Sequence, residues 1–321
     1  MRVLNVSWLC LLPLIVVQGF FHTGGHRQRV ISGFSSDGDL HQEISDVAVR
    51  AARKAGECIK VAFGLEKDIK SKIGSRDIVT EFDTQAQEII RQTILEAFPD
   101  HNFLGEEDVA AGRDASTAAA KSVEDAEHLW IVDPIDGTTN FALGIPLCGV
   151  IIAYASRGKV MGGYIYDPNR DEMFTAWRGQ GTYLNGKRIH CCNTKTLKDS
   201  VVCTGSPPNF DSLQGCLRAT NLISDKVRTV RYLGSASIML SWLALGRIAA
   251  YFETDMNVWD IAAGSLMVQE AGGKVTDVWG GEYGLNTRNL VSSNGIIHNE
   301  LLDVLVEAEM WMPQDANIVR K

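Results

Sequence analysis

The most informative stretch of the sequence is residues 130–141, which are Trp-Ile-Val-Asp-Pro-Ile-Asp-Gly-Thr-Thr-Asn-Phe. Its apolar start, Leu129 to Val132, predicts a buried strand that a proline then interrupts. Asp133 and Asp136 follow, so two carboxylates lie on one tight turn at the edge of a sheet. Mg²⁺ prefers oxygen ligands, and a backbone carbonyl such as that of Ile135 can complete a set of carboxylates, water and phosphate. The turn is therefore predicted to hold metal, the alternative being a simple Asp-Pro turn.

Two further acidic segments carry information only in combination with this one. Residues 105–108, Gly-Glu-Glu-Asp, would alone be typical of a solvated loop. Residues 259–264, Trp-Asp-Ile-Ala-Ala-Gly, place Asp260 at the expected N-terminus of a helix, where it could equally be an ordinary N-cap. Neither segment on its own establishes a site.

Taken together and in this order, the three segments resemble the inositol monophosphatase family. Its signatures are a Gly-Glu-Glu loop, a Trp-x-x-Asp-Pro-Ile-Asp-Gly-Thr-Thr-Asn-Phe strand and turn, and a Trp-Asp-x-Ala-Ala-Gly helix start. The resemblance covers roughly residues 40 to 310. It implies an α+β fold, a layered αβαβα sandwich of the inositol monophosphatase and fructose-bisphosphatase type. It further implies a homodimer that hydrolyses phosphate monoesters with two to three Mg²⁺ per active site and is typically inhibited by Li⁺.

The resemblance also implies which residues would bind metal. The first ion would bind Glu106, Asp133 and the carbonyl of Ile135, and the second would bind Asp133, Asp136 and Asp260. Asp133 would therefore bridge the two ions. A third and weaker ion is implied near Glu106.

Two further residues are implied to act on water and phosphate. Thr138 falls on the family's water-orienting threonine, and Asp83 falls on its partner carboxylate. A hydroxyl that donates to Asp83 can accept from a water molecule and aim the lone pair of that water at phosphorus. The backbone N–H groups of Gly137 and Thr138 would meet the phosphate, because a helix is expected to begin after Asp136.

The alcohol part of the substrate is implied to lie against Gly234-Ser235-Ala236, Glu253 and Asp260. Glu253 would accept hydrogen bonds from ring hydroxyls, and the alternative is an exposed glutamate at the end of a strand. The sequence departs from well-known inositol phosphatases at Ser235, Asn257 and Asp108, which leaves the chemistry intact but widens the choice of substrate.

The expected reaction is therefore hydrolysis of a small phosphorylated polyol, with inositol 1-phosphate as the leading substrate. Within the same chemistry, histidinol phosphate or another sugar phosphate is the alternative. From a different class, the alternative is a catalytically silent protein that uses the fold to bind a phosphorylated ligand.

The composition fits a globular enzyme and argues against a nucleic-acid partner. Of the 321 residues, 45% are hydrophobic and 22% are charged, enough for one large domain or two intimate halves. Lys and Arg number 31 against 39 Asp and Glu, a net charge of -8, and no basic tract interleaved with aromatics follows the first forty residues. An acidic protein with an anionic substrate needs local positive charge, which bound divalent cations can supply.

Residues 1–37 are expected to form a targeting leader. The apolar run from Trp8 to Val17 is too short to span a bilayer with ease and is typical of a signal peptide. Residues 22–36 are basic, rich in hydroxyls and free of acidic side chains, as transit peptides are. The two signals in tandem favour a plastid reached through a bipartite leader, and a single secretory signal with a linker is the open alternative. No membrane span is expected in the mature chain.

The remaining chain, 38–321, is expected to form a single phosphatase domain with halves of about 38–190 and 191–321. Apolar residues at three-to-four spacing from Leu40 to Val61 predict a long helix. A second helix is expected from near Asp83 or Thr84, with Thr84 and Gln87 as its capping box. Residues 110–127 are interpreted as a variable loop and 149–189 as an antiparallel meander, after which strands and helices alternate.

Overall fold

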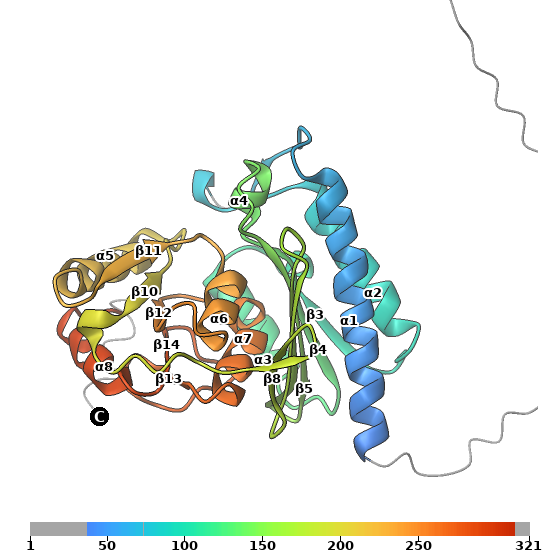
Figure 1. The fold of residues 1–321 in the computed structure, drawn as a ribbon. Coiled ribbons are helices and arrows are strands. Elements are labelled where there is room, and N and C mark those ends of the chain that lie inside the picture. Colours follow the sequence, from blue (N-terminus) through green and yellow to red (C-terminus); the bar gives the residue numbers. More distant parts are fainter. Residues whose placement is uncertain (1–36, 73, 312–321) are drawn as a thin grey trace, which may run out of the picture.

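The fold was obtained as a computed structural model that describes residues 37–72 and 74–311. The predicted leader lies almost wholly outside the described residues, because residues 1–36 are not among them. The described chain forms five layers in the order helices, sheet, helices, sheet, helices (Figure 1). The predicted αβαβα sandwich is therefore confirmed.

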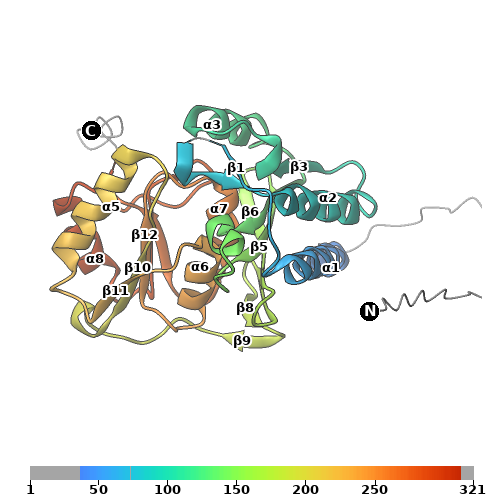
Figure 2. The ribbon, with the colours of Figure 1, turned by 90° about the horizontal axis from the view of Figure 1, so that it is seen from above.

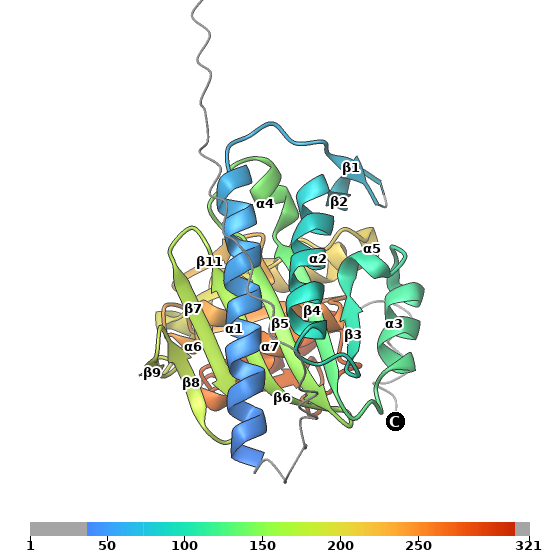
Figure 3. The ribbon, with the colours of Figure 1, turned by 90° about the vertical axis from the view of Figure 1, so that its right-hand side faces the viewer.

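The first helical layer consists of α1 (Asp37–Ala62) and α2 (Glu81–Leu95). The two helices lie side by side across one face of the larger sheet (Figure 3). Residues of the predicted apolar stripe, among them Ile44 and Ala51, are fully buried. Val61 is an exception to the prediction: it lies in the last turn of α1 and is 75% exposed, because it points away from the core face that its buried neighbours Ile59 and Ala62 occupy.

The larger sheet has seven strands in the order β3-β4-β5-β6-β7-β8-β9. Only β3 and β4 pair in parallel, and the strands from β5 onward form the predicted meander. Its hairpin turns at Arg157-Gly158 and Asn185-Gly186 have positive φ angles at both residues, as two-residue turns of this kind require. The strands are β3 (Asn102–Gly105), β4 (Leu129–Asp136), β5 (Gly149–Ser156), β6 (Lys159–Asp167), β7 (Glu172–Trp177), β8 (Gly181–Leu184) and β9 (Lys187–Ile189).

The middle layer consists of α6 (Ala236–Ala244) and α7 (Val258–Glu270), which lie between the two sheets (Figure 2). Both helices are buried on nearly all sides, as expected for helices covered from two faces. Gly163 on β6 permits the close approach of α7, because a Cβ atom there would lie 2.7 Å from the carbonyl oxygen of Ala263. This contact brings the start of α7 to the end of β4.

The smaller sheet has five strands in the order β11-β10-β12-β14-β13, with β10 parallel to both of its neighbours. Two helices, α5 (Phe210–Ile223) and α8 (His298–Glu307), cover its outer face (Figure 1). The strands are β10 (Val201–Thr204), β11 (Thr229–Tyr232), β12 (Ala250–Glu253), β13 (Lys274–Asp277) and β14 (Leu290–Ser293).

Short elements connect these layers around one edge of the molecule. They are β1 (Lys70–Ser71), the 3₁₀ turns η1 (Gly74–Arg76), η2 (Glu106–Asp108) and η3 (Leu197–Asp199), β2 (Ile78–Val79) and α4 (Thr138–Ala142). Strands β1 and β2 pair in a hairpin of their own. Within residues 37–72 and 74–311, no helix is both long and apolar enough to cross a membrane.

Two predictions about local structure were wrong. Residues 110–127 contain a helix, α3 (Arg113–Ser122), where a variable loop was expected. Three successive alanines have a strong helix propensity, and Ala120 packs against the core. These two effects outweigh the lack of apolar residues at regular helical spacing. The capping box of α2 is formed by Thr80 and Asp83, since the helix begins earlier than predicted.

Candidate active site

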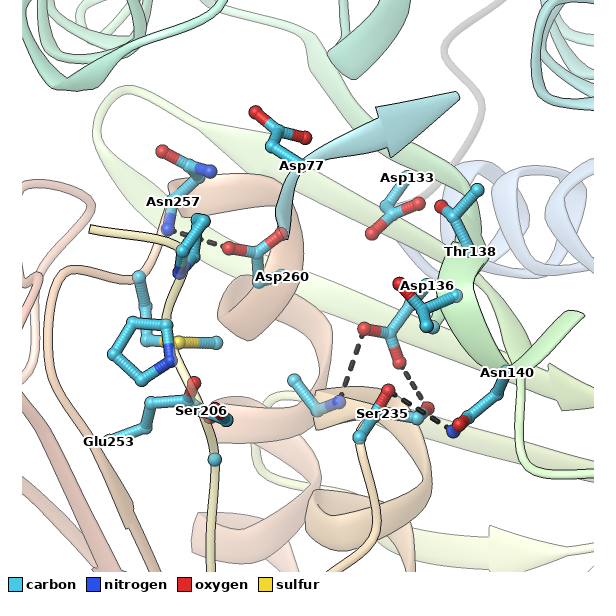
Figure 4. A pocket seen from close by; sticks show the side chains of 18 of the residues that line it. Asp77, Asp133, Asp136, Thr138, Asn140, Ser206, Ser235, Glu253, Asn257 and Asp260 are labelled. Atoms are coloured by element: carbon cyan, nitrogen blue, oxygen red, sulfur yellow. Dashed lines mark hydrogen bonds between the residues drawn. The ribbon is translucent and has the colours of Figure 1, made fainter. Parts of the chain in front are cut away.

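A cavity of about 530 Å³ opens where the ends of both sheets meet the starts of three helices. Asp133, Asp136 and Thr138 lie on its β4–α4 side, and Asp260 and Glu253 lie across from them (Figure 4). All the residues predicted to contact metal or substrate line this cavity, although the chain between the first and the last of them spans both sheets. Asp83 lies behind the wall, within hydrogen-bond distance of Thr138.

Three carboxylates from separate elements converge at the cavity. Glu106, Asp133 and Asp260 each offer one oxygen, and these oxygens all lie within 4.8 Å of one another. Asp133 is almost fully buried, and burial together with the charges of Glu106, Asp136 and Asp260 raises its pKa well above the usual range. Carboxylates held this close repel one another unless a cation offsets their charge. The donor set therefore fits a divalent cation that prefers oxygen ligands.

Lys72 contributes a cation that the sequence analysis did not anticipate. Its ammonium group lies 2.9 Å from Glu106 and 2.8 Å from Glu107. Although burial opposes its charged form, Glu106 and Glu107 raise the pKa of Lys72. One ammonium group offsets part of the negative charge in the group, and the remaining carboxylates still need positive charge.

Asp136 points away from the other three carboxylates and toward the start of α6. Its Oδ1 accepts from the backbone N–H of Ala236 at 3.1 Å, and its Oδ2 accepts from the N–H of Ser237 at 2.7 Å. The hydroxyls of Ser235 and Ser237 also donate to Oδ2. Burial raises the pKa of Asp136, and these donors oppose the rise. Ser237 was missed by the sequence analysis, because nothing local in the sequence shows that α6 begins against β4.

Asp83 has two hydrogen-bonding tasks at once. Its Oδ2 accepts from the backbone N–H of Thr80 at 2.8 Å and from the Thr80 hydroxyl at 2.6 Å, which closes the capping box of α2. Its Oδ1 accepts from the Thr138 hydroxyl at 3.2 Å. That hydroxyl also lies 3.0 Å from the carbonyl oxygen of Ile135, so its proton is shared between two acceptors. The cap therefore orients Asp83 toward Thr138.

Asp260 is held in a similar way. Its Oδ2 accepts from the backbone N–H of Asn257 at 2.7 Å and forms the capping box of α7. Asp260 also offers one oxygen to the three-carboxylate group, so the two interpretations of Asp260, helix cap and site residue, are compatible. The N-termini of α2, α6 and α7 all point their partial positive charge at site carboxylates, which favours the ionised form.

Glu253 ends β12 and faces the cavity from the side of the smaller sheet. It is 8% exposed, so the alternative of an exposed glutamate at a strand end is wrong. Its Oε2 accepts from the hydroxyl of Tyr251 at 2.6 Å. Burial raises the pKa of Glu253 to about 7, and the Tyr251 hydrogen bond opposes the rise.

The turn between β4 and α4 is shaped by a glycine and an asparagine. Gly137 has a φ of +85°, and a Cβ atom there would lie 2.9 Å from the carbonyl oxygen of Leu147. Asn140 donates from Nδ2 to the carbonyls of Leu147 at 2.8 Å and Leu233 at 2.7 Å, which ties the turn to the segment before α6. The Gly137-Thr138 backbone and the Gly234-Ser235-Ala236 segment therefore form one continuous wall.

The fold and this site define a class of enzyme, the phosphatases of the inositol monophosphatase type. The sequence profile described as the "Inositol monophosphatase family" matches residues 40–310. The chain belongs to this family.

Two curated relatives are similar to this chain over nearly their full length. A protein of Thermotoga maritima named fructose-1,6-bisphosphatase/inositol-1-monophosphatase is 35% identical over 262 residues, which are 82% of this chain and 95% of the relative. An inositol-1-monophosphatase of Mesorhizobium japonicum is 38% identical over 262 residues, 81% of this chain and 94% of the relative.

A solved structure shows the same fold. The IMPase of Thermotoga maritima superposes with a TM-score of 0.74 at 34% identity, covering 83% of this chain and 98% of that chain. The expected family and fold are thus confirmed.

Proposed function

We propose that this protein is a Mg²⁺-dependent phosphomonoesterase that hydrolyses inositol 1-phosphate to inositol and phosphate. The observation that carries the proposal is the convergence of Glu106, Asp133 and Asp260, with their oxygens within 4.8 Å, in a cavity that also contains Thr138 and Glu253. The names of the relatives above support a phosphate ester of a polyol or sugar as the substrate.

The residues fit the divalent cations that the family uses. Glu106, Asp133 and the carbonyl of Ile135 would hold the first of two to three ions, and Asp133, Asp136 and Asp260 would hold the second. All five residues line the cavity, and the oxygens of Glu106, Asp133 and Asp260 lie within 4.8 Å of one another. When bound, divalent cations offset the negative charge of a phosphate and increase the acidity of water. The backbone N–H of Asn257 orients the carboxylate of Asp260, and the hydroxyls of Ser235 and Ser237 orient that of Asp136.

Thr138 and Asp83 are proposed to orient the attacking water. Because the Thr138 hydroxyl directs its single proton toward Asp83 and the carbonyl of Ile135, its lone pairs are left to accept from water. A water held in this way has a lone pair directed away from the threonine and toward the cavity, where the phosphorus would lie. The Thr80 cap matters here, since it prevents Asp83 from turning away.

The remaining walls are proposed to bind the two parts of the substrate. The backbone N–H groups of Gly137 and Thr138 stand at the start of α4, where no preceding carbonyl of the helix can accept from them, and would meet the phosphate. The Gly234-Ser235-Ala236 segment, Glu253 and Asp260 would contact the alcohol part, with Glu253 accepting from a ring hydroxyl.

The proposal is tested by phosphate release from purified protein at several Mg²⁺ concentrations, with and without a chelator. The substrates are inositol 1-phosphate, histidinol phosphate, a sugar bisphosphate and p-nitrophenyl phosphate. We expect chelator-sensitive turnover with the highest kcat/KM on inositol 1-phosphate.

Other results would indicate a different substrate or a different function. A preference for histidinol phosphate or the bisphosphate would retain the chemistry and replace the substrate. No turnover of any ester, with binding of a phosphorylated ligand, would identify a silent binding protein. The homodimer implied by the family is tested by light scattering of the same preparation.

A further inference from the structure

The carboxylate of Glu253 is not free to turn. The hydroxyl of Tyr251, a residue with no exposed surface, donates to its Oε2 at 2.6 Å. The two residues are neighbours on one face of β12, since side chains two positions apart on a strand point the same way. Within residues 37–72 and 74–311, no second hydrogen bond to this carboxylate occurs. Oε2 thus already accepts one hydrogen bond, and the remaining lone pairs of the carboxylate are left for a ligand.

The backbone of Gly205 lies directly against the same carboxylate. A Cβ atom at this position would lie 1.7 Å from Oε2, 1.9 Å from Cδ and 2.0 Å from Oε1 of Glu253. Gly205 follows β10, whose last residue pairs with Phe252, so the parallel ladder places the glycine beside Glu253. Glycine at this position leaves the space that the carboxylate occupies.

We infer that Tyr251 and Gly205 are positioning residues that set substrate selectivity by holding the carboxylate of Glu253 in one orientation at the cavity. The inference rests on the proposed function and adds two residues to it.

The alternative role for both residues is purely structural. Burial and the Glu253 charge raise the pKa of Tyr251 well above its usual range, so the phenol stays a donor. If Glu253 lacked this donor, its buried carboxylate would have no hydrogen-bond partner among residues 37–72 and 74–311. A structural role predicts a loss of stability that affects every substrate equally. A positioning role predicts a change confined to substrates with a hydroxyl at this place.

The test compares two substrates in four variants of the full chain. The measured quantity is the ratio of kcat/KM for inositol 1-phosphate to kcat/KM for p-nitrophenyl phosphate. Tyr251→Phe removes one hydroxyl and should lower this ratio by about 3- to 12-fold, the effect of one hydrogen bond. Gly205→Ala should lower it at least as much, because the three atoms nearest the new methyl group all belong to the Glu253 carboxylate, which must move to make room. Tyr164→Phe and Gly284→Ala are the matched controls.

The controls reproduce the chemical changes elsewhere in the protein. The hydroxyl of Tyr164 makes a partly buried contact of 2.7 Å with Ser45, neither residue lines the cavity, and a Cβ atom at Gly284 would meet nothing within 4 Å. We expect both controls to leave the ratio unchanged. In addition, Tyr251→Phe should have no further effect on the ratio in a Glu253→Gln background, because residues that act through one another are not additive.

The outcomes separate the inference from the function on which it rests. A ratio that Tyr251→Phe and Gly205→Ala leave at the wild-type value overturns the inference while the phosphatase stands. An effect of Tyr251→Phe on the ratio that persists in full in the Glu253→Gln background also overturns the inference. Absence of phosphate release from both esters by the unaltered protein overturns the proposed function, and the inference with it.

Discussion

The hydroxyl of Thr138 donates to Oδ1 of Asp83 across 3.2 Å, which joins the first residue of α4 to the first turn of α2. Because Oδ2 of Asp83 is engaged in the helix cap, only Oδ1 is available to Thr138. The helix cap thus holds Asp83 in place as an acceptor for the hydroxyl proton of Thr138. The position of Asp83 in turn influences the direction in which the lone pairs of that hydroxyl can accept a hydrogen bond from water.

Thr138→Ala is expected to lower kcat by about 10²–10⁴-fold with little change in KM, the range for a group that positions a proton in the transition state. The physical reason is that water orientation matters only as the reaction proceeds. Steady-state kinetics on inositol 1-phosphate measures the two constants. The matched control is Thr139→Ala, the next residue, whose side chain is exposed. A rise in KM with an unchanged kcat would make Thr138 a binding residue.

Glu253→Gln is expected to lower kcat/KM for inositol 1-phosphate by about 10- to 150-fold, since one charge-assisted hydrogen bond contributes about 1.5–3 kcal/mol. The amide replaces one acceptor with a donor, and p-nitrophenyl phosphate has no ring hydroxyl to lose. Kinetics on both esters tests the prediction. Equal losses on both would assign Glu253 to support of the metal site, and no loss on either would remove it from substrate binding.

The site was largely predictable where local sequence fixes the geometry. Asp133 and Asp136 sit at the end of one strand, and Asp260 sits at the start of one helix, so short motifs define them. That Glu106 would join them depends on the parallel pairing of β3 with β4, which places Gly105 opposite Val132. No local pattern contains that pairing, and only the family resemblance supplied it.

The residues that were missed act through contacts between distant segments. Lys72, Ser237 and Tyr251 each form an ion pair or hydrogen bond with a predicted site residue. Lys72 and Ser237 lie on different elements from their partners, whereas Tyr251 lies on the same strand as Glu253. The capping box was misplaced although Thr80 and Asp83 have the required spacing, because the helix was expected to begin near Asp83 or Thr84. The structure shows that one carboxylate can perform both tasks.

His298 should make the protein less stable in acid. Burial lowers its pKa to about 4, and the ring lies 2.9 Å from both Thr276 and Ser293. The unfolded chain takes up this proton below the ordinary value of 6.5, whereas the folded chain does so only near 4. Stability from this group is therefore complete above pH 6.5 and is lost as the pH falls from 6.5 toward 4.

The test is the free energy of unfolding in urea for the wild-type protein and His298→Gln, which cannot titrate. The stability advantage of the wild type over the variant should shrink steadily as the pH is lowered through this window. An advantage that stays constant would mean that His298 titrates alike in the folded and unfolded chains.

The leader prediction concerns residues 1–37, most of which lie outside the described residues. We propose that these residues, fused to a fluorescent reporter, direct import into an organelle, and that residues 1–20 alone stop in the secretory pathway. Fluorescence microscopy of the two fusions distinguishes the alternatives. Secretion of both would leave a single signal peptide.

The central claim is that Asp133, between Glu106 and Asp260, holds the metal on which hydrolysis depends. The most direct measurement is the rate of phosphate release from inositol 1-phosphate by Asp133→Asn across a range of Mg²⁺ concentrations. The substitution keeps the size of the side chain and removes a buried negative charge that the neighbouring carboxylates repel, so the fold should persist. Asp171→Asn, at an exposed turn, is the matched control. We predict no measurable turnover by Asp133→Asn at any Mg²⁺ concentration, and turnover near the wild-type rate at ordinary Mg²⁺ would contradict the account.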